Sequence, residues 1–523
     1  MSLYDLPDEL LDHIIGLTVP EGIESFALSC KTIYNIAEPQ ITQHNTYKRR
    51  WKHFAYADFQ LPEPGPTLRP QTALQLIHAI ALDPLIAQYI ESARLWVDPS
   101  KIYRHRNLLS TAQSRFEQDE ASLTAIRRLL RDSRYLKAAN QDPDLWLRRI
   151  QLDDKFADEA PTNFATAFLL TLLPNVKALG LPQGWANLPR PEEDYRAGQL
   201  DATQDIWPVL NAITRAANGA TSRNTALAKL ERILPYANKG YDQRNALQEL
   251  EPFFTAPSIK EVYACNCVAV DDGYTGILFS WRHSDLVSSL RKVELVACCI
   301  DSDGITELIK HTPQLKCLRY SHATKWHGCQ FDWDAGAFVA AIGMHLGGSL
   351  TEFAVTIDCL YGDVETGVTS MHDFTCLRNV ELDVSLFCAP SIDSGERLGM
   401  SSTQGTTWEA SKIPCLADIL PQSVKSVDLF AGGKENVDHT AALRSLFSQS
   451  LDKQRSMLPK LERLAVRCSP AQYETLNTDL SRTDNWMACE LVNAVCTVAV
   501  APAPSRRPLW EEDFHSSFGP LTG

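Results

Sequence analysis

The sequence has little of what marks membrane-spanning or nucleic-acid-binding chains. Its 50 Lys and Arg residues are outnumbered by 64 Asp and Glu residues, and the resulting formal charge of −14 is unfavourable for binding nucleic-acid phosphates. The longest apolar run near the C-terminus, Leu491 to Ala501, contains Asn493 and is too short to cross a bilayer. We therefore expect partners that are neither nucleic acid nor membrane.

Cysteine patterns for metal binding or disulfide frameworks are also missing. The 14 cysteines are dilute in 523 residues, and none forms a Cys-x-x-Cys pair. His322, His327 and Cys329 are close in sequence, but a fourth ligand at zinc-finger spacing is lacking. The first twenty residues do not have the basic start and continuous apolar stretch of a signal peptide. We expect no metal, no cofactor and an intracellular location, cytoplasmic and/or nuclear, with reduced thiols.

Motifs of the common enzyme classes are absent as well. The sequence contains no G-x-S-x-G, G-x-x-x-x-G-K-[ST], G-x-G-x-x-G or H-E-x-x-H. The segment Asp301-Ser302-Asp303-Gly304 imitates the start of a calcium loop, yet the oxygen ligands that should follow are missing. It fits a turn that leads into a helix better. We expect a non-catalytic protein.

What the sequence does contain begins with a helical module at residues 1–45. Apolar residues recur at spacings of four, four and three in the series Leu6, Leu10, Ile14 and Leu17. We expect three short helices, the last of which ends at Pro39. So few residues cannot bury much apolar area alone, and the module needs a neighbour or a partner to cover it.

The string LPDELLDHIIGLTVPEGIESFALSCKTIYNIA, from Leu6 to Ala37, resembles an F-box. It has the Leu-Pro-x-Glu-Leu opening, the Ile-rich first helix, the Pro-Glu turn and the Ala-Leu-x-Cys-Lys segment in the order of that motif. The resemblance implies a three-helix module that docks onto the Skp-type adaptor of a cullin–RING ubiquitin ligase. The docking residues that it implies are Leu6, Pro7, Leu10, Ile14, Ile23, Leu28, Cys30 and Lys31. The alternative is an ordinary amphipathic helical hairpin in which these apolar residues form an intramolecular core.

Residues 46–160 are expected to form a helical connector. Trp51 and Phe54 are one helical turn apart, so we expect them to pack against the preceding module while the basic residues between them face water.

From about residue 165 to residue 500, a short helix-like piece is repeatedly followed by the pattern apolar-x-x-apolar-x-apolar. The alternating last pair is typical of a half-buried strand. The matches are Val176, Leu179, Leu181; Leu290, Val293, Leu295; Leu315, Leu318, Tyr320; Leu350, Phe353, Val355; Leu377, Val380, Leu382; Val424, Val427, Leu429; and Leu461, Leu464, Val466, with Ile259 and Val262 at the first two positions of another.

This pattern resembles leucine-rich repeats in a degenerate form. An F-box followed by such degenerate repeats is similar to the large fungal F-box family. From Ile259 onward, the intervals between first positions range from 25 to 47 residues, whereas regular repeats take roughly 20 to 29. Between 182 and 258 we find no clean match, only a helical stretch around Leu227 to Leu234, so this part is either an insertion or missed repeats. The fold class that we predict is α+β, with a three-helix F-box and a helical connector followed by an irregular leucine-rich-repeat-like α/β solenoid.

Residues 501–523 form a Pro-rich tail. We expect its aromatic residues, Trp510, Phe514 and Phe518, to cap the end of the solenoid, with a linear motif as the alternative. On the strands themselves, charged residues between the apolar positions are the candidates for contact with a protein substrate. They are Glu294, Arg319, Glu381, Asp428 and Arg467.

These observations favour the substrate-recognition subunit of an SCF-type (Skp–cullin–F-box) E3 ubiquitin ligase. Its partners would be the Skp-type adaptor and a protein substrate whose identity the sequence does not give. The alternative is a ligase-independent F-box or repeat scaffold that mediates protein–protein interaction.

Overall fold

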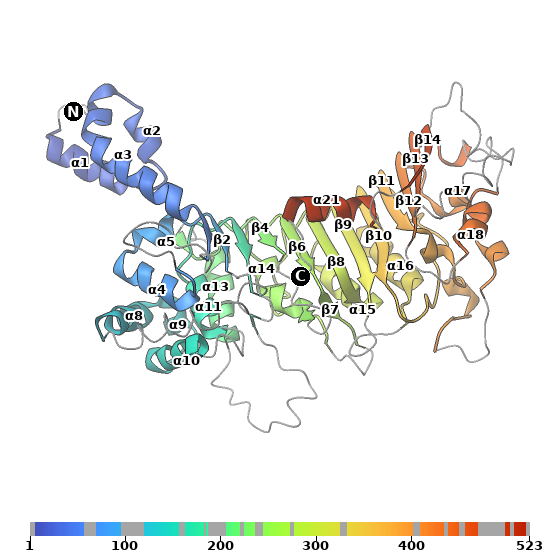
Figure 1. The fold of residues 1–523 in the computed structure, drawn as a ribbon, viewed down its shortest axis with the longest axis horizontal. Coiled ribbons are helices and arrows are strands. Elements are labelled where there is room, and N and C mark those ends of the chain that lie inside the picture. The colour runs from blue at the N-terminus through green and yellow to red at the C-terminus, as the bar shows by residue number, and fades with distance from the viewer. Residues whose placement is uncertain are drawn as a thin grey trace. The chain divides into compact units, whose positions relative to one another are not determined.

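The structure is a computed structural model of the 523-residue chain. It describes residues 6–56, 70–95, 120–155, 163–182, 185–186, 206–219, 224–235, 244–271, 277–324, 332–400, 408–432, 438–448, 456–468, 497–502 and 507–518. The chain forms two compact units (Figure 1). Unit 1 comprises Met1–Ala186, Gln204–Glu231 and Ala256–Ser258, and unit 2 comprises Asn187–Thr203, Arg232–Thr255 and Ile259–Gly523.

Unit 1 begins with three helices, α1 (Asp8–Leu17), α2 (Ile23–Ala27) and α3 (Lys31–Trp51). Asp8 and Glu9 lie in the first turn of α1, where negative charge complements the helix dipole. The Cys30 sulfur accepts a hydrogen bond from the Ile33 amide at 3.4 Å and so caps α3. One apolar side of each helix faces a shared core, which consists of Ile15, Ile23, Ala27, Ile33 and Ala37. We refer to residues 6–45 as the helical module.

The expected end of the third helix at Pro39 is wrong. Helix α3 continues through Pro39 to Trp51. Proline removes one backbone donor from a helix, but the apolar side of α3 continues beyond it, with His44 and Trp51 both buried. Tertiary packing therefore outweighs the local cost of the proline.

The rest of unit 1 is mainly helical, as expected of the connector, but it also contains strands. Strands β1 (His53–Ala55), β2 (Ser92–Arg94) and β3 (Ala178–Gly180) pair in parallel. Trp51 stacks on Phe54 with ring centroids 5.9 Å apart, and both are buried. The helices of this part are α4 (Ala73–Leu82), α5 (Leu85–Tyr89), α8 (Glu120–Asp132), α9 (Arg134–Ala138), α10 (Pro143–Lys155), α11 (Asn163–Leu170) and α13 (Trp207–Asn218).

Unit 2 mixes helices with a large parallel sheet that does not close into a barrel in its described part. The sheet order is β4 (Arg232–Leu234), β6 (Glu261–Cys265), β8 (Lys292–Ile300), β9 (Cys317–Ala323), β10 (Glu352–Cys359), β11 (Asn379–Asp383), β12 (Ser426–Ala431), β13 (Arg463–Cys468) and β14 (Thr497–Pro502). Short β5 (Asn245–Ala246) and β7 (Cys267–Ala269) pair beside β8. The helical elements are η4 (Leu247–Leu250), α14 (Glu251–Phe254), α15 (Ser302–Lys310), α16 (Ala335–Leu346), η5 (Val384–Phe387), η6 (Ile392–Ser394), η7 (Ala410–Lys412), α17 (Leu416–Ile419), α18 (His439–Leu446) and α21 (Leu509–Phe518).

The six patterns from Leu290 to Val466 correctly predict strands, because β8 to β13 contain the last two apolar positions of each. Those apolar residues are buried on one face of the sheet. On this face Tyr320 packs against Phe338 of α16, with ring centroids 4.7 Å apart. Figure 1 shows α15 and α16 beside the strands and α21 running across them. The predicted helix around Leu227 to Leu234 is wrong: the backbone turns at Leu227 (φ 61°), and Arg232–Leu234 is strand β4.

Aspartates begin three helices of unit 2. Asp301, Asp334 and Asp438 are the N-caps of α15, α16 and α18. The side chain of each accepts a hydrogen bond from the backbone amide of the residue three positions later. The interpretation of Asp301 to Gly304 as a turn leading into a helix is thus confirmed.

Candidate functional site

The predicted docking residues of the helical module differ in exposure. Leu10 is 50% exposed and Leu28 is 78% exposed. Pro7, at the start of α1, and Lys31, the first residue of α3, are exposed too. These side chains are available at the surface of the module.

The other predicted docking residues are less accessible. Leu6, Ile14 and Cys30 are partly buried. Ile23 is fully buried in the core of the module. Its side chain is therefore not on a docking surface, and its inclusion among the docking residues is wrong. Ile23 belongs to the same core cluster as Ile15 of α1 and Ile33 of α3.

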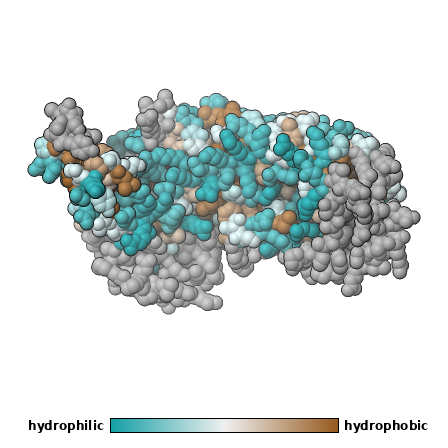
Figure 2. Space-filling model, turned by 90° about the horizontal axis from the view of Figure 1, so that it is seen from above, coloured by the Kyte–Doolittle hydropathy of each residue, from teal (hydrophilic) through white to brown (hydrophobic). Residues whose placement is uncertain are grey.

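Two large apolar residues on the module surface were not among the predicted ones. Leu17 at the end of α1 is 73% exposed, and Tyr34 in the first turns of α3 is 47% exposed. Figure 2 shows brown apolar atoms among teal polar ones on the module. The helical period alone places Leu17 in the same series as Leu10, but it does not say which members of that series face solvent.

A polar cavity of about 530 Å³ lies in unit 1, lined by the helical module, the connector and the later residues Asn175, Lys177 and Lys229. The buried His44 ring contacts the Tyr89 hydroxyl at 2.9 Å through Nδ1 and a Glu24 carboxylate oxygen at 3.2 Å through Nε2. The hydrogen bond from Lys48 is the main cause that lowers the pKa of Glu24. Burial raises the pKa of Tyr89 to about 12.

Ion pairs line the rest of this cavity. Lys177 reaches Glu91 at 2.9 Å, and Lys229 pairs with Glu21 and donates to the Asn175 side chain at 2.8 Å. Because positive and negative charges alternate around the cavity, they largely neutralise one another. Of these two ion pairs, the one between Lys229 and Glu21 links the helical module to a later segment of unit 1.

In unit 2, four of the five predicted substrate-contact residues occupy one row across the sheet. The register pairs Glu294 with Arg319, and it continues through Ala354 to Glu381 and Asp428. Arg467 lies two residues further along its strand than the Asp428 partner, Ala465. Alternation along the strands turns this row away from the apolar core. We refer to the face that contains it as the strand face.

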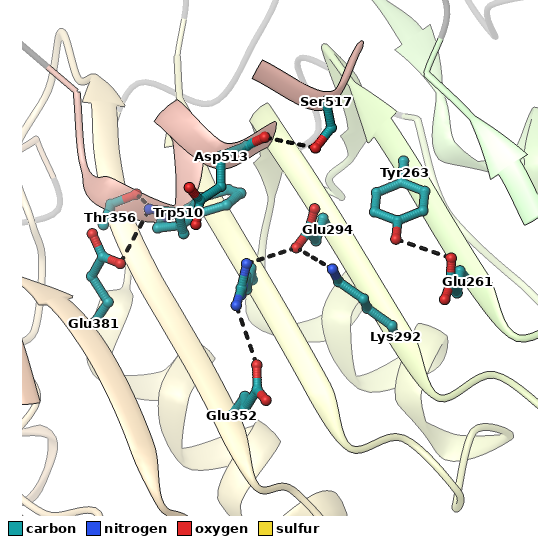
Figure 3. Close-up of polar contacts among 11 residues, drawn as sticks. Glu261, Tyr263, Lys292, Glu294, Glu352, Thr356, Glu381, Trp510, Asp513 and Ser517 are labelled. Carbon is teal, nitrogen blue, oxygen red and sulfur yellow. Dashed lines mark hydrogen bonds and ion pairs between the residues drawn. The ribbon is translucent and has the colours of Figure 1, made fainter. Parts of the chain in front are cut away.

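The charged residues of the strand face contact one another. Arg319 donates to Glu294 at 3.0 Å and to Glu352 at 3.2 Å, and Lys292 lies 3.0 Å from the same Glu294 carboxylate (Figure 3). Arg463 donates to Asp428 at 2.8 Å. Neighbouring parallel strands lie only about 4.8 Å apart, so opposite charges in adjacent positions reach each other directly.

Helix α21 covers part of the strand face (Figure 3). The Glu381 carboxylate accepts hydrogen bonds from the backbone amides of Leu509 at 2.6 Å and Trp510 at 3.2 Å, and so binds the N-terminus of the helix. The Trp510 indole donates to the Thr356 hydroxyl at 3.2 Å, and this hydroxyl donates to Glu511 at 3.0 Å.

We expected the aromatic residues of α21 to cap the end of the solenoid, and this expectation is wrong. Trp510 and Phe514 are buried, and Tyr263 of β6 lies 6.3 Å from Phe514 and 4.8 Å from Phe518 between ring centroids. Thus α21 extends over the strand face from β11 to β6. Aromatic residues four positions apart lie on the same side of a helix, so this side packs along the whole length of α21 and not only at one end.

This arrangement corrects the expectation that the five candidates are open to a substrate. Glu294, Glu381 and Asp428 are buried, and Arg467 lies 3.9 Å from Glu512 of α21. These side chains contact residues of neighbouring strands and of α21. The sequence locates them on the strand face but does not reveal what covers that face.

Burial sets the ionisation of the carboxyl groups near α21. Removal from water, together with the smaller effect of the neighbouring Asp358, raises the pKa of Glu511 to about 8. Burial is also the main cause that raises the pKa of Glu381 to about 7, against the two amide hydrogen bonds that lower it. Glu511 and Thr356 were missed by the sequence analysis, although Pro508 followed by Leu-Trp-Glu-Glu is a recognisable helix start.

Within the described ranges, no cluster of three or more His, Cys, Asp or Glu side chains is arranged to hold a metal ion. His322 is buried and contacts the Tyr320 hydroxyl at 2.6 Å, while His327 and Cys329 lie outside the described residues. The helices in this same part of the chain include none with both the length and the apolar character to cross a membrane.

A scan against protein-family models finds no model that matches this chain, and a search of curated proteins finds no matching relative.

Proposed function

We propose that the chain is a non-catalytic substrate receptor of an SCF-type ubiquitin ligase. The helical module binds the Skp-type adaptor, and unit 2, as an irregular leucine-rich-repeat-like solenoid, binds the protein substrate. The F-box-like string from Leu6 to Ala37 supports the first half, and the row of parallel strands with regularly buried apolar positions supports the second.

The main supporting observation is the division of the module into a closed core and an exposed apolar surface. Ile15, Ile23 and Ile33 fill the core, while Leu10 and Leu28 remain at the surface. A set of large exposed apolar side chains on one small module is typical of a protein-binding surface. Since the module's core is complete without Leu10 and Leu28, these two residues are free to contribute to binding and not to folding.

The expected size of this contribution follows from apolar burial. Complete burial of a leucine side chain contributes about 1.5–3 kcal/mol, and a leucine that docking buries only in part contributes roughly half of that, most of which truncation to alanine removes. Leu10→Ala combined with Leu28→Ala should therefore weaken adaptor binding by about 2 kcal/mol, or roughly thirtyfold.

The test is calorimetric titration of a purified Skp-type adaptor into the full chain. We expect binding by the wild type and roughly thirtyfold weaker binding by the Leu10→Ala, Leu28→Ala variant. Leu82→Ala is the matched control, because Leu82 is 66% exposed but lies on α4 outside the module. Absence of binding by the folded wild type would refute the ligase function. Equal affinity of wild type and double variant would refute the docking surface.

A further inference from the structure

We propose that the strand face of unit 2 is a binding site for a short amphipathic helix, that α21 occupies this site in the free chain, and that a protein partner binds by replacing α21 with a helix of its own. As a statement about substrates this rests on the proposed function. The binding site itself does not depend on the adaptor.

The first part of the site recognises the beginning of a helix. Glu381 accepts hydrogen bonds from the amides of Leu509 and Trp510, which are backbone groups that every helix N-terminus offers. A carboxylate in this position also complements the positive end of the helix dipole. Glu381 therefore selects a helix by its end and direction, without reading its sequence.

The second part of the site recognises side chains. Trp510, Phe514 and Phe518 recur every four residues along the side of α21 that faces the strands, and Tyr263 packs against the last two. Thr356 links the Trp510 indole to the Glu511 carboxyl group. A matching helix thus has an aromatic residue in its first turn, a carboxyl or amide side chain directly after it, and aromatic residues four and eight positions on.

The opposite side of α21 faces solvent. Asp513, Ser516 and Ser517 are exposed. The helix is therefore amphipathic, with an apolar side that a partner must reproduce and a polar side that is free to vary.

The strands beneath α21 form a complete sheet without it. Strands β9, β10 and β11 are paired with neighbours on both sides, and their apolar residues point to the opposite face, toward α16. The side chains under α21 include the charged or polar Thr356 and Glu381, which a solvated face tolerates. Removal of α21 would therefore expose a polar face and leave the main core intact, which is what an exchangeable helix requires.

The experiment uses a fluorescent synthetic peptide with the sequence of residues 507–518, titrated into full-length protein. In the wild type, α21 is tethered to its site at an effective concentration on the order of millimolar, so the free peptide should bind weakly. Trp510→Ala combined with Phe514→Ala removes the two buried aromatic anchors of α21. We expect this variant to bind the peptide at least tenfold more tightly than wild type does.

Two further variants assign the site. Asp513→Ala combined with Ser516→Ala alters only the exposed side of α21, and we expect wild-type weak binding. Addition of Glu381→Ala to the Trp510→Ala, Phe514→Ala variant should reduce peptide binding at least tenfold. If the folded double variant fails to bind the peptide, or if Glu381→Ala leaves its binding unchanged, the proposal is refuted.

A second measurement covers the case in which the double variant does not fold. Excess peptide, synthesised with heavy isotopes so that its mass differs, is added to the wild-type chain during hydrogen exchange. We expect faster exchange in the chain's own residues 509–518 and unchanged exchange in β9 and β10. Unchanged exchange in 509–518 at saturating peptide would overturn the proposal. Neither experiment contains the adaptor, so failure here is distinct from failure of the ligase function.

Discussion

The docking of α21 should weaken as pH rises, and Glu511 should be the cause. Glu511 is only 1% exposed, and its pKa in the docked helix is about 8, well above the ordinary value of 4.5. The docked state therefore holds a proton on Glu511 that an undocked, solvated Glu511 releases. Docking is strongest below pH 4.5, and this stabilisation is lost as pH rises from about 4.5 to about 8.

The magnitude follows from the size of the shift. Each pKa unit corresponds to about 1.4 kcal/mol, so at pH 7 the protonation of Glu511 costs the docked helix on the order of 3 kcal/mol. Between pH 5 and 7.5 the docking equilibrium should change by up to about tenfold per pH unit. Asp358 adds to this shift and Arg507 opposes it, while hydrogen bonds from Thr356 and Ser321 partly stabilise the ionised form.

Glu511→Gln should remove most of this pH dependence. A glutamine amide has the shape of the carboxyl group, accepts the Thr356 hydrogen bond and does not titrate. The matched control is Glu512→Gln, because Glu512 is partly exposed and its ion pair with Arg467 is long, at 3.9 Å.

The assay is hydrogen exchange of residues 509–518 at pH 5.5, 6.5 and 7.5, corrected for intrinsic rates. Wild type and Glu512→Gln should both lose protection steeply with pH, while Glu511→Gln should depend much less on pH and be better protected at pH 7.5. Any dependence that remains is expected from Glu381, whose pKa is about 7. If Glu511→Gln keeps the wild-type slope, Glu511 is not the group that links α21 docking to protons.

Three further predictions concern the stability of unit 2, measured by chemical denaturation. Gly347→Ala should destabilise the unit by about 1–3 kcal/mol, because a Cβ there would lie 2.1 Å from the Asp373 carbonyl, whereas Gly348→Ala, with nothing within 4 Å, should have little effect. Leu429→Ala should cost about 2–5 kcal/mol, since this side chain is fully buried; a smaller loss would mean that the core collapses around the gap. Asp301→Ala should cost about 0.5–2 kcal/mol through loss of the α15 cap, and equal stability would exclude a capping role.

The strands of unit 2 could be predicted from the sequence because each buries its apolar residues in the same way. Leu318 and Tyr320, or Val427 and Leu429, alternate with polar residues that face away from the core. This local period survives the irregular spacing between strands, since each strand needs only its neighbours to complete a buried face. Strand β4 escaped prediction because its three residues, Arg232–Leu234, lie in no match to the pattern, whereas the equally short β3 lies within the match Val176, Leu179, Leu181.

The cover of the strand face could not be predicted in the same way. Glu381 is 128 residues from Leu509, whose amide it binds, and no local pattern connects the two. Charge alternation placed Glu381 on the correct face, but solvent and a docked helix are equally compatible with that pattern. Likewise Pro39 suggested a helix end, since its local cost is visible in the sequence and the packing of Trp51 that overrides it is not.

The protonation of Glu511 affects which partner helix competes best with α21. A partner helix that repeats the Glu511 carboxyl group would face the same protonation cost as α21, so its competition with α21 would not depend on pH. A partner helix with glutamine at that position would escape the cost. Its advantage over α21 should then grow by up to about tenfold per pH unit toward pH 8. Peptides of residues 507–518 with glutamate or glutamine at position 511, titrated into the wild type at pH 6 and 7.5, distinguish these cases, and equal pH dependence of the two peptides would contradict the linkage.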